Sequence, residues 1–371
     1  MNGWKYTMRN NRQLFERFSN SNIFLLVTAI FFSKIIAFVL MEYDILIINL
    51  GGGSDANYYN SYAEGFTDTA VNIWPVLLRW LNDYGLYSRD LTTYFLFFLS
   101  LIVIPIMVVR LSGITFKRNQ KYYLYALLVC LIHPTIFFFS TDIFRDIFMA
   151  FSFLLGCLTV KWFLNSHSIF GAVFYFLLSV AIGFFLIEIR PYLGYAYLLS
   201  LLFLKIKFTK SRAFYLGLLY LVLLFAANYL GVLDLLTEYR SGFEESEGGS
   251  TLGLSFSNPI LFIPNFIISF LGQMLGLYIT NPLALVLFVL ETVPFFFMLI
   301  YVLKNIKLAD SFVRFLIIFF VFYGSVWLIG NDNLGTAVRL RIYNYLAIYI
   351  SFFYILRLKR SSFRKSSSSR V

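Results

Sequence analysis

The sequence predicts an all-α polytopic membrane protein. Of its 371 residues, 60% are hydrophobic and 13% are charged, whereas ordinary soluble domains carry about 25% charged residues. The apolar runs are about 17 to 23 residues long, enough for a helix to cross the ~30 Å hydrocarbon core of a bilayer. Segments of about ten residues with alternating polarity, which would indicate a transmembrane barrel, do not occur.

Ten apolar runs are candidate transmembrane helices: 23–43, 92–111, 122–139, 144–164, 169–187, 191–204, 212–233, 283–303, 311–330 and 342–358. A further apolar stretch, 258–281, contains Pro259 and Pro264, and Pro282 follows it directly. Proline interrupts a helix by removing a backbone donor, and we expect a re-entrant or interfacial segment here. If this stretch crosses the membrane instead, the number of transmembrane helices is 11.

The distribution of positive charge predicts the orientation. With ten crossings and both termini in the cytoplasm, 22 of the 30 lysines and arginines lie on the cytoplasmic side, as the positive-inside rule requires. Lys34 lies within the first span, and seven arginines face outward: Arg79, Arg89, Arg145, Arg190, Arg240, Arg339 and Arg341. Because topology accounts for the net charge of +11, we predict a lipid bilayer and no nucleic acid as partner.

The domain organisation follows from this topology. Residues 1–22 form a cytoplasmic N-terminus ahead of an uncleaved first helix. Residues 23–358 form one transmembrane domain, with outer loops at 44–91 and 234–257, and 359–371 are a cytoplasmic basic tail. The outward side of this domain carries four polar stretches.

The first stretch is "GGGSDANYYNSYAEG", residues 51–65. Its glycines leave backbone amides free to approach an anion, and Asp55 follows them at once. Tyr58, Tyr59 and Tyr62 are candidates for stacking on sugar rings. The alternative is a flexible turn with Asp55 as a helix N-cap. The following "VNIWPVLLRWLNDYG", which includes Trp74, is amphipathic and suited to lying in the membrane interface.

The second stretch is "STDIFRDIF", residues 140–148. Asp142, Arg145 and Asp146 are spaced three and four apart, so in a helix beginning here they share one face. The alternative is that Asp142 caps the helix while Arg145 and Asp146 form a local pair.

The third stretch is "IEIRPYLGYAY", residues 187–197. Glu188 and Arg190 lie between two short spans, Pro191 is suited to the first position of the next helix, and Tyr192 follows. The alternative to a functional role is a helix-end charge pair that reaches the interface.

The fourth stretch is "NDNLGTAVRLRIYNY", residues 331–345. Arg339 and Arg341 lead directly into an apolar helix, and charges at that depth are costly and usually functional or paired. If the segment is helical, the two arginines face different directions. Since guanidinium binds phosphate bidentately and ammonium does not, seven outward arginines without an outward lysine favour a phosphate or pyrophosphate ligand.

Several other chemistries have no sequence support. His133 and His167 are far apart in the predicted topology, and we expect His133 to be a buried helix residue. Cys130 and Cys157 fall inside apolar runs and are expected in the core. We find no metal-ligand spacing and no nucleotide-binding motif, and therefore predict no metal and no cofactor.

At "NDNLGTAVRLR", "FRDIF" and "RPYLG" the chain resembles the O-antigen/polysaccharide polymerases of the Wzy type. That resemblance implies a glycosyltransferase of the bacterial inner membrane that polymerises undecaprenyl-pyrophosphate-linked oligosaccharides outside the cytoplasm, in lipopolysaccharide or capsule synthesis. It also implies a chain-length regulator as a possible partner. The chain is similar too to the wider class of lipid-dependent glycosyltransferases, in which a carboxylate of the first outer loop often acts as base; Asp55 matches that position.

Together these observations predict a site at the outer face. We expect Arg145, Arg190, Arg339 and Arg341 to hold the pyrophosphate, and a carboxylate to accept the proton of the acceptor hydroxyl. The candidate bases, in order of preference, are Asp55 and then Asp142 or Asp146. Tyrosines 58, 59, 62 and 192, with Trp74, would line a glycan groove.

The alternative function is a flippase or transporter of lipid-linked oligosaccharide, or another glycosyltransferase that uses a lipid-phosphate sugar. A flippase needs polar residues through the full depth of the membrane. Charges inside the predicted spans are nearly limited to Lys34 and Glu291, and this favours an enzyme. Glu291 has three possible arrangements: a pair with Lys34, a pair with an outward arginine, or a side chain that reaches the interface.

Overall fold

The computed structural model describes residues 19–47, 53–245 and 250–368. Gly51, Gly52, most of the predicted cytoplasmic N-terminus and the last residues of the tail lie outside this part. Within it the chain is helical, with one isolated β-bridge between Thr251 and Asn333. The first half contains α2 (Asn20–Glu42), α3 (Gly53–Ala63), α4 (Ile73–Asp83), α5 (Arg89–Phe98), η1 (Leu99–Val103), α6 (Ile104–Leu111), α7 (Phe116–Ile132), α8 (Pro134–Phe138), α9 (Arg145–Leu164) and α10 (Ile169–Ile189).

The second half begins with α11 (Pro191–Leu202), α12 (Lys210–Tyr229), α13 (Asp234–Glu245), η2 (Pro259–Leu261), α14 (Phe262–Ser269) and η3 (Phe270–Met274). It continues with α15 (Pro282–Leu287), η4 (Phe288–Thr292), α16 (Val293–Lys304), η5 (Ile306–Leu308), α17 (Ser311–Gly330) and α18 (Leu334–Ser368). Three of these elements, η1, η3 and η4, are π-helical turns that continue directly into α-helix or follow it.

Seven helices of the described chain are long and apolar enough to cross a membrane. They are Asn20–Glu42, Arg89–Leu111, Arg145–Leu164, Ile169–Ile189, Lys210–Tyr229, Pro282–Lys304 and Ser311–Gly330. The protein is therefore an all-helical polytopic membrane protein. The predicted spans 122–139, 191–204 and 342–358 correspond to α7 with α8, to α11 and to part of α18, and the total of ten crossings stays a prediction.

Two predicted elements differ in the structure. The predicted span 122–139 is broken, because α7 ends at Ile132 and α8 starts at Pro134. Proline disfavours helical geometry in the residue before it, and His133 accordingly has φ −68° and ψ 107°. The predicted outer loop 234–257 is not a simple loop, since α13 occupies its first half.

The stretch 258–281 forms one short helix followed by a non-helical segment, and no long helix. Its apolar helix runs from Pro259 to Met274, shorter than the seven candidate spans. Gly276, with φ +57°, then turns the chain, and residues 277–280 are exposed. A re-entrant or interfacial placement of this stretch stays a prediction.

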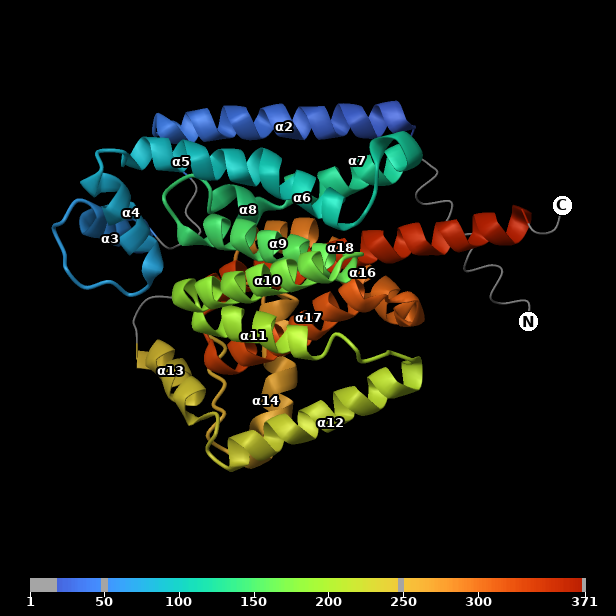
Figure 1. The fold of residues 1–371 in the computed structure, drawn as a ribbon. Coiled ribbons are helices and arrows are strands. Elements are labelled where there is room, and N and C mark those ends of the chain that lie inside the picture. Colours follow the sequence, from blue (N-terminus) through green and yellow to red (C-terminus); the bar gives the residue numbers. More distant parts are fainter. Residues whose placement is uncertain (1–18, 48–52, 246–249, 369–371) are drawn as a thin grey trace.

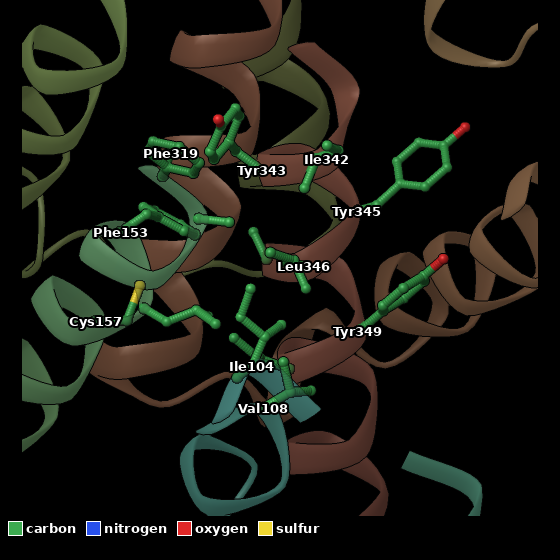
Figure 2. Packing of buried hydrophobic residues seen from close by; sticks show 14 of the residues in the cluster. Ile104, Val108, Phe153, Cys157, Phe319, Ile342, Tyr343, Tyr345, Leu346 and Tyr349 are labelled. Carbon is green, nitrogen blue, oxygen red and sulfur yellow. The ribbon is translucent and has the colours of Figure 1, made fainter. Parts of the chain in front are cut away.

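The C-terminal helix α18 is the centre of the bundle. Residues 342–355 are all buried, and α18 contacts α17, α16, α6 and η3. Figure 2 shows this packing around Ile342, Tyr343 and Leu346, with neighbours supplied by α9, α6 and α17: Phe153, Cys157, Ile104, Val108 and Phe319. Cys130 and Cys157 are buried and free, as the sequence predicts.

The outward segments of the predicted topology gather at one end of the molecule. In Figure 1, α3, α4 and α13 lie at the left end of the bundle, while α2 starts and α18 ends at the right. The start of α9, the junction of α10 with α11 and the turn between α17 and α18 all face the left end as well. Three of the four polar stretches thus meet at this end, with α3 of the first beside them.

Candidate functional site

The candidate site is centred on Arg339, in the second turn of α18. Its guanidinium donates Nε and Nη2 to Asp146 Oδ2, at 3.0 and 2.8 Å, and Nη1 to Asp55 Oδ2 at 2.5 Å. The guanidinium also lies 5.0 Å from the ring centre of Phe139. One arginine therefore joins the first, second and fourth polar stretches through α3, α9 and α18.

The two aspartates on Arg339 differ in accessibility. The side chain of Asp146 is fully buried, whereas that of Asp55 is 39% exposed. Asp146 lies in the first turn of α9 and Asp55 in the first turn of α3, where the partial positive charge of a helix N-terminus favours a carboxylate. Asp55 alone of the two presents an oxygen to solvent.

Arg190 enters the same cluster from the junction of α10 and α11. Pro191 starts α11 and holds Arg190 in an extended conformation, with φ −155° and ψ 104°, as proline does to the residue before it. Arg190 is buried and its guanidinium lies 5.5 Å from the ring centre of Tyr192, which stacks on Tyr323. Glu188 is exposed, and the alternative of a Glu188–Arg190 pair is not seen among the ion pairs of the described residues.

Arg145 completes the cluster. Its Nη1 donates to the carbonyl of Ile189 at 3.2 Å, and Asp146 interacts electrostatically with Arg339, Arg190 and Arg145 together. The three arginines exceed the two aspartates, Asp55 and Asp146, by one positive charge. We call these five residues the arginine cluster.

Several polar atoms of the arginine cluster are buried without a hydrogen-bond partner: Arg145 Nε, Arg190 Nη1 and Asp146 Oδ1. Within the described residues, neither Arg145 nor Arg190 has a carboxylate within 4.0 Å. Buried donors of this kind normally form a hydrogen bond, and leaving a buried donor without one costs about 1–3 kcal/mol. The cluster can therefore receive an anionic group that accepts from Arg145 and Arg190.

Asp142 lies outside the helix on which the sequence analysis placed it with Arg145 and Asp146. α9 begins at Arg145, and its N-cap is Phe144, so Asp142 shares no helical face with Arg145 and Asp146 and caps no helix. It instead accepts from Arg89 Nε and Nη2, at 2.9 and 2.6 Å. The alternative, a local Arg145–Asp146 ion pair, is not seen either, since Asp146 pairs with Arg339.

The tyrosines of α3 are less available than predicted. Tyr59 and Tyr62 are only 4% and 9% exposed, so their ring faces are covered by the protein. Burial raises the pKa of Tyr59. Tyr58 donates its hydroxyl to the carbonyl of Thr69. Trp74 is also buried, and its indole Nε1 donates to the carbonyl of Ile143 at 2.9 Å, which fixes α4 against the turn before α9.

Arg341 lies away from the arginine cluster. Its Nη2 donates to Glu291 Oε2 at 2.9 Å. The other oxygen, Oε1, accepts from Thr135 N at 2.7 Å and Thr135 Oγ1 at 2.5 Å, and lies 3.0 Å from His133 Nδ1. Of the three arrangements open to Glu291, the structure has the pair with an arginine, Arg341, which the predicted topology places on the outward side.

Two contacts were not predicted from the sequence: His133 with Glu291, and Arg240 with Asp332. His133 is buried as expected, but it stands at a helix break beside Glu291; the following Pro134 is the sequence signal for that break. The Arg240–Asp332 ion pair links α13 to the turn between α17 and α18, and nothing in the sequence pairs those residues. Across 19–47, 53–245 and 250–368, no three His, Cys, Asp or Glu side chains are grouped to hold a metal ion.

No family model, curated protein or solved structure matches the chain.

Proposed function

We propose that the protein is a glycosyltransferase that polymerises lipid-linked oligosaccharide repeat units at the outer face of the bacterial inner membrane. The observation that carries the proposal is the arginine cluster, with its excess positive charge and its unpartnered donors on Arg145 and Arg190. A pyrophosphate between sugar and lipid is an anion with oxygens for several such donors. Undecaprenyl pyrophosphate is the carrier implied by the family resemblance.

The chemistry assigned to the cluster is glycosyl transfer from the pyrophosphate to an acceptor hydroxyl. The acceptor hydroxyl oxygen forms a bond to the anomeric carbon of the donor sugar, while the bond from that carbon to the pyrophosphate oxygen breaks. The electron pair leaves with the pyrophosphate, where Arg145, Arg190 and Arg339 stabilise the charge that develops. The acceptor proton passes to a carboxylate.

Asp55 is the best-placed candidate for the base. Its side chain is 39% exposed, while the carboxylate of Asp146 is fully buried beneath Arg339. Asp142 is held bidentately by Arg89, so both its oxygens are engaged. Asp146 and Asp142 are therefore assigned to holding arginines in place. Tyr192, half-buried beside Arg190, remains the aromatic residue best placed to contact the ligand.

The proposal is tested with lipid-linked glycans from cells that lack this gene, separated by size on a gel. We expect single repeat units to accumulate and the wild-type gene to restore a ladder. Arg339→Ala should not restore it, because loss of a donor to developing charge costs about 3 kcal/mol, or two orders of magnitude in rate. Arg79→Ala is the matched control, since Arg79 is an outward arginine bound to the exposed Asp68.

Two outcomes would contradict the proposal. If the deleted cells still make a full ladder, the protein is not the polymerase. If no unit-capped glycan reaches the outer face at all, translocation of the lipid-linked unit is lost, and a flippase becomes the better reading.

A further inference from the structure

Arg339 and Arg341 occupy opposite sides of one helix. They are two residues apart in α18, and successive residues of an α-helix turn by about 100°, so their side chains diverge by roughly 200°. Arg339 binds Asp146 and Asp55 on one side, and Arg341 binds Glu291 on the other. The start of α18 is thus held between two ion pairs with different neighbouring helices.

The Arg341–Glu291 pair is fully enclosed. Arg341 is 2% and Glu291 0% exposed, and a buried charge in a membrane helix is costly unless it is paired. Glu291 lies in the π-helical turn η4, a local irregularity that often occurs at functional sites. Its two oxygens accept hydrogen bonds from Arg341 and Thr135, and Oε1 also lies 3.0 Å from His133 Nδ1.

The surroundings of this pair fix its geometry. Lys34 of α2 donates Nζ to the carbonyl of His133 at 3.3 Å. Gly276 leaves the room for Arg341, because a Cβ there would lie 2.7 Å from Arg341 Nη1. Tyr345 stacks on Phe295 and hydrogen-bonds the backbone of Met274 at 2.7 Å. Figure 2 shows Tyr345 and Tyr349 projecting from α18 to one side, away from Phe153 and Phe319.

We propose that Glu291 is a positioning residue of the arginine cluster, acting through Arg341. By holding Arg341, Glu291 sets the rotation of α18 about its axis and thereby the place of Arg339 on the opposite side. Neither Glu291 nor Arg341 touches the ligand. This inference rests on the proposed function, because it concerns the same glycosyl transfer.

The direct test uses three variants purified in lipid nanodiscs: Glu291→Gln, Arg341→Gln and the double variant. The rate of glycan elongation is measured for each with lipid-linked repeat units. Each single change should lower kcat by a factor on the order of 10–100, as misplacement of a positioned group by about 1 Å does. KM for the donor should change much less. The double variant should be no slower than either single one, since both remove the same contact.

Two further variants separate positioning from a general loss of folding. Arg341→Lys keeps a cation for Glu291, so it should retain near wild-type kcat. If Arg341 instead bound phosphate bidentately, the Arg341→Lys variant would lose activity. Glu291→Ala should be slow and should regain rate on adding formate, whose carboxylate fills the vacated place. Glu238→Gln, on the exposed side of α13, is the matched control and should elongate normally.

The inference is overturned if Glu291→Gln elongates at the wild-type rate while Arg339→Ala does not, or if Arg341→Lys is as slow as Arg341→Gln. Failure of formate to raise the rate of a folded Glu291→Ala protein would also overturn it. Failure of the proposed function looks different. In that case the wild-type protein would not elongate the glycan, or Arg339→Ala would elongate it as fast as wild type.

Discussion

The carboxylates of Asp55 and Asp146 bind one guanidinium but stand in different environments. Asp146 neutralises Arg339 inside the bundle, and Tyr343 donates its hydroxyl to the backbone carbonyl of Asp146 at 3.2 Å. Asp55 meets the same arginine from the half-exposed helix α3. Removing a charge from these two positions should therefore have separate consequences, one for folding and one for catalysis.

Asp146→Asn should destabilise the protein, because it leaves Arg339 buried against a neutral amide. Breaking a buried ion pair by removing one partner costs about 3–5 kcal/mol. Asp55→Asn should destabilise the protein much less, because Arg339 keeps its ion pair with the buried Asp146, yet it should abolish elongation. Thermal unfolding in detergent, measured beside the elongation rate, distinguishes them; an unstable Asp55→Asn protein would contradict the assignment of Asp55 as base.

Short elements, more than the long spans, place the functional side chains. The prolines that open α8 and α11 set the residues before them, His133 and Arg190, at helix junctions. The helix α13 is held by Arg240, which donates to the carbonyls of Leu254 and Asn331, both at 2.6 Å, and pairs with Asp332. The turn that leads into α18 is thus tied to a helix remote in sequence.

Arg240→Ala should release α13 from the turn between α17 and α18. The change leaves Asp332 buried without its cation, a cost of about 3–5 kcal/mol, and local opening exposes the backbone of α13. Chymotrypsin should then cut after Tyr239 or Phe243 faster than in the wild type, with Arg79→Ala as control. Equal cutting rates in the two variants would show that Arg240 does not hold the helix.

The sequence predicts local features of this site better than its pairings. The helix start at Pro191, the buried cysteines and the interrupted stretch at 258–281 follow from residue type and spacing. The pairing of Asp142 with Arg89, and of Glu291 with Arg341, joins residues about fifty positions apart. Such pairs depend on how whole helices lie against each other, which periodicity within one segment does not determine.

At the scale of the whole molecule, the two ends of the helix bundle carry different parts of the chain. The segments assigned to the outside lie at one end of the bundle, and the described chain starts and ends at the other (Figure 1). An odd number of crossings would separate those two ends. The short helix Pro259–Met274 is the element on which this parity depends.

Labelling of single cysteines with a membrane-impermeant maleimide tests the topology. Tyr278→Cys should react in intact cells, because Tyr278 is exposed and the predicted topology places the segment after the short helix outside. Lys307→Cys should react only after permeabilisation, and the wild-type protein should stay unlabelled because Cys130 and Cys157 are buried. Labelling of Tyr278→Cys only after permeabilisation would indicate that 258–281 crosses the membrane.

The contrast between α12 and α18 has a consequence for how this protein diverges. Along α12 the buried side chain is Asn228 alone, so lipid is nearly the whole environment of that helix. Almost any apolar side chain is tolerated in contact with lipid. Every side chain of 342–355 in α18, by contrast, is packed by specific neighbours. Among descendants of a common ancestor, α12 should drift freely within its hydrophobicity while α18 keeps its identity, so a search for distant relatives should be built on α18.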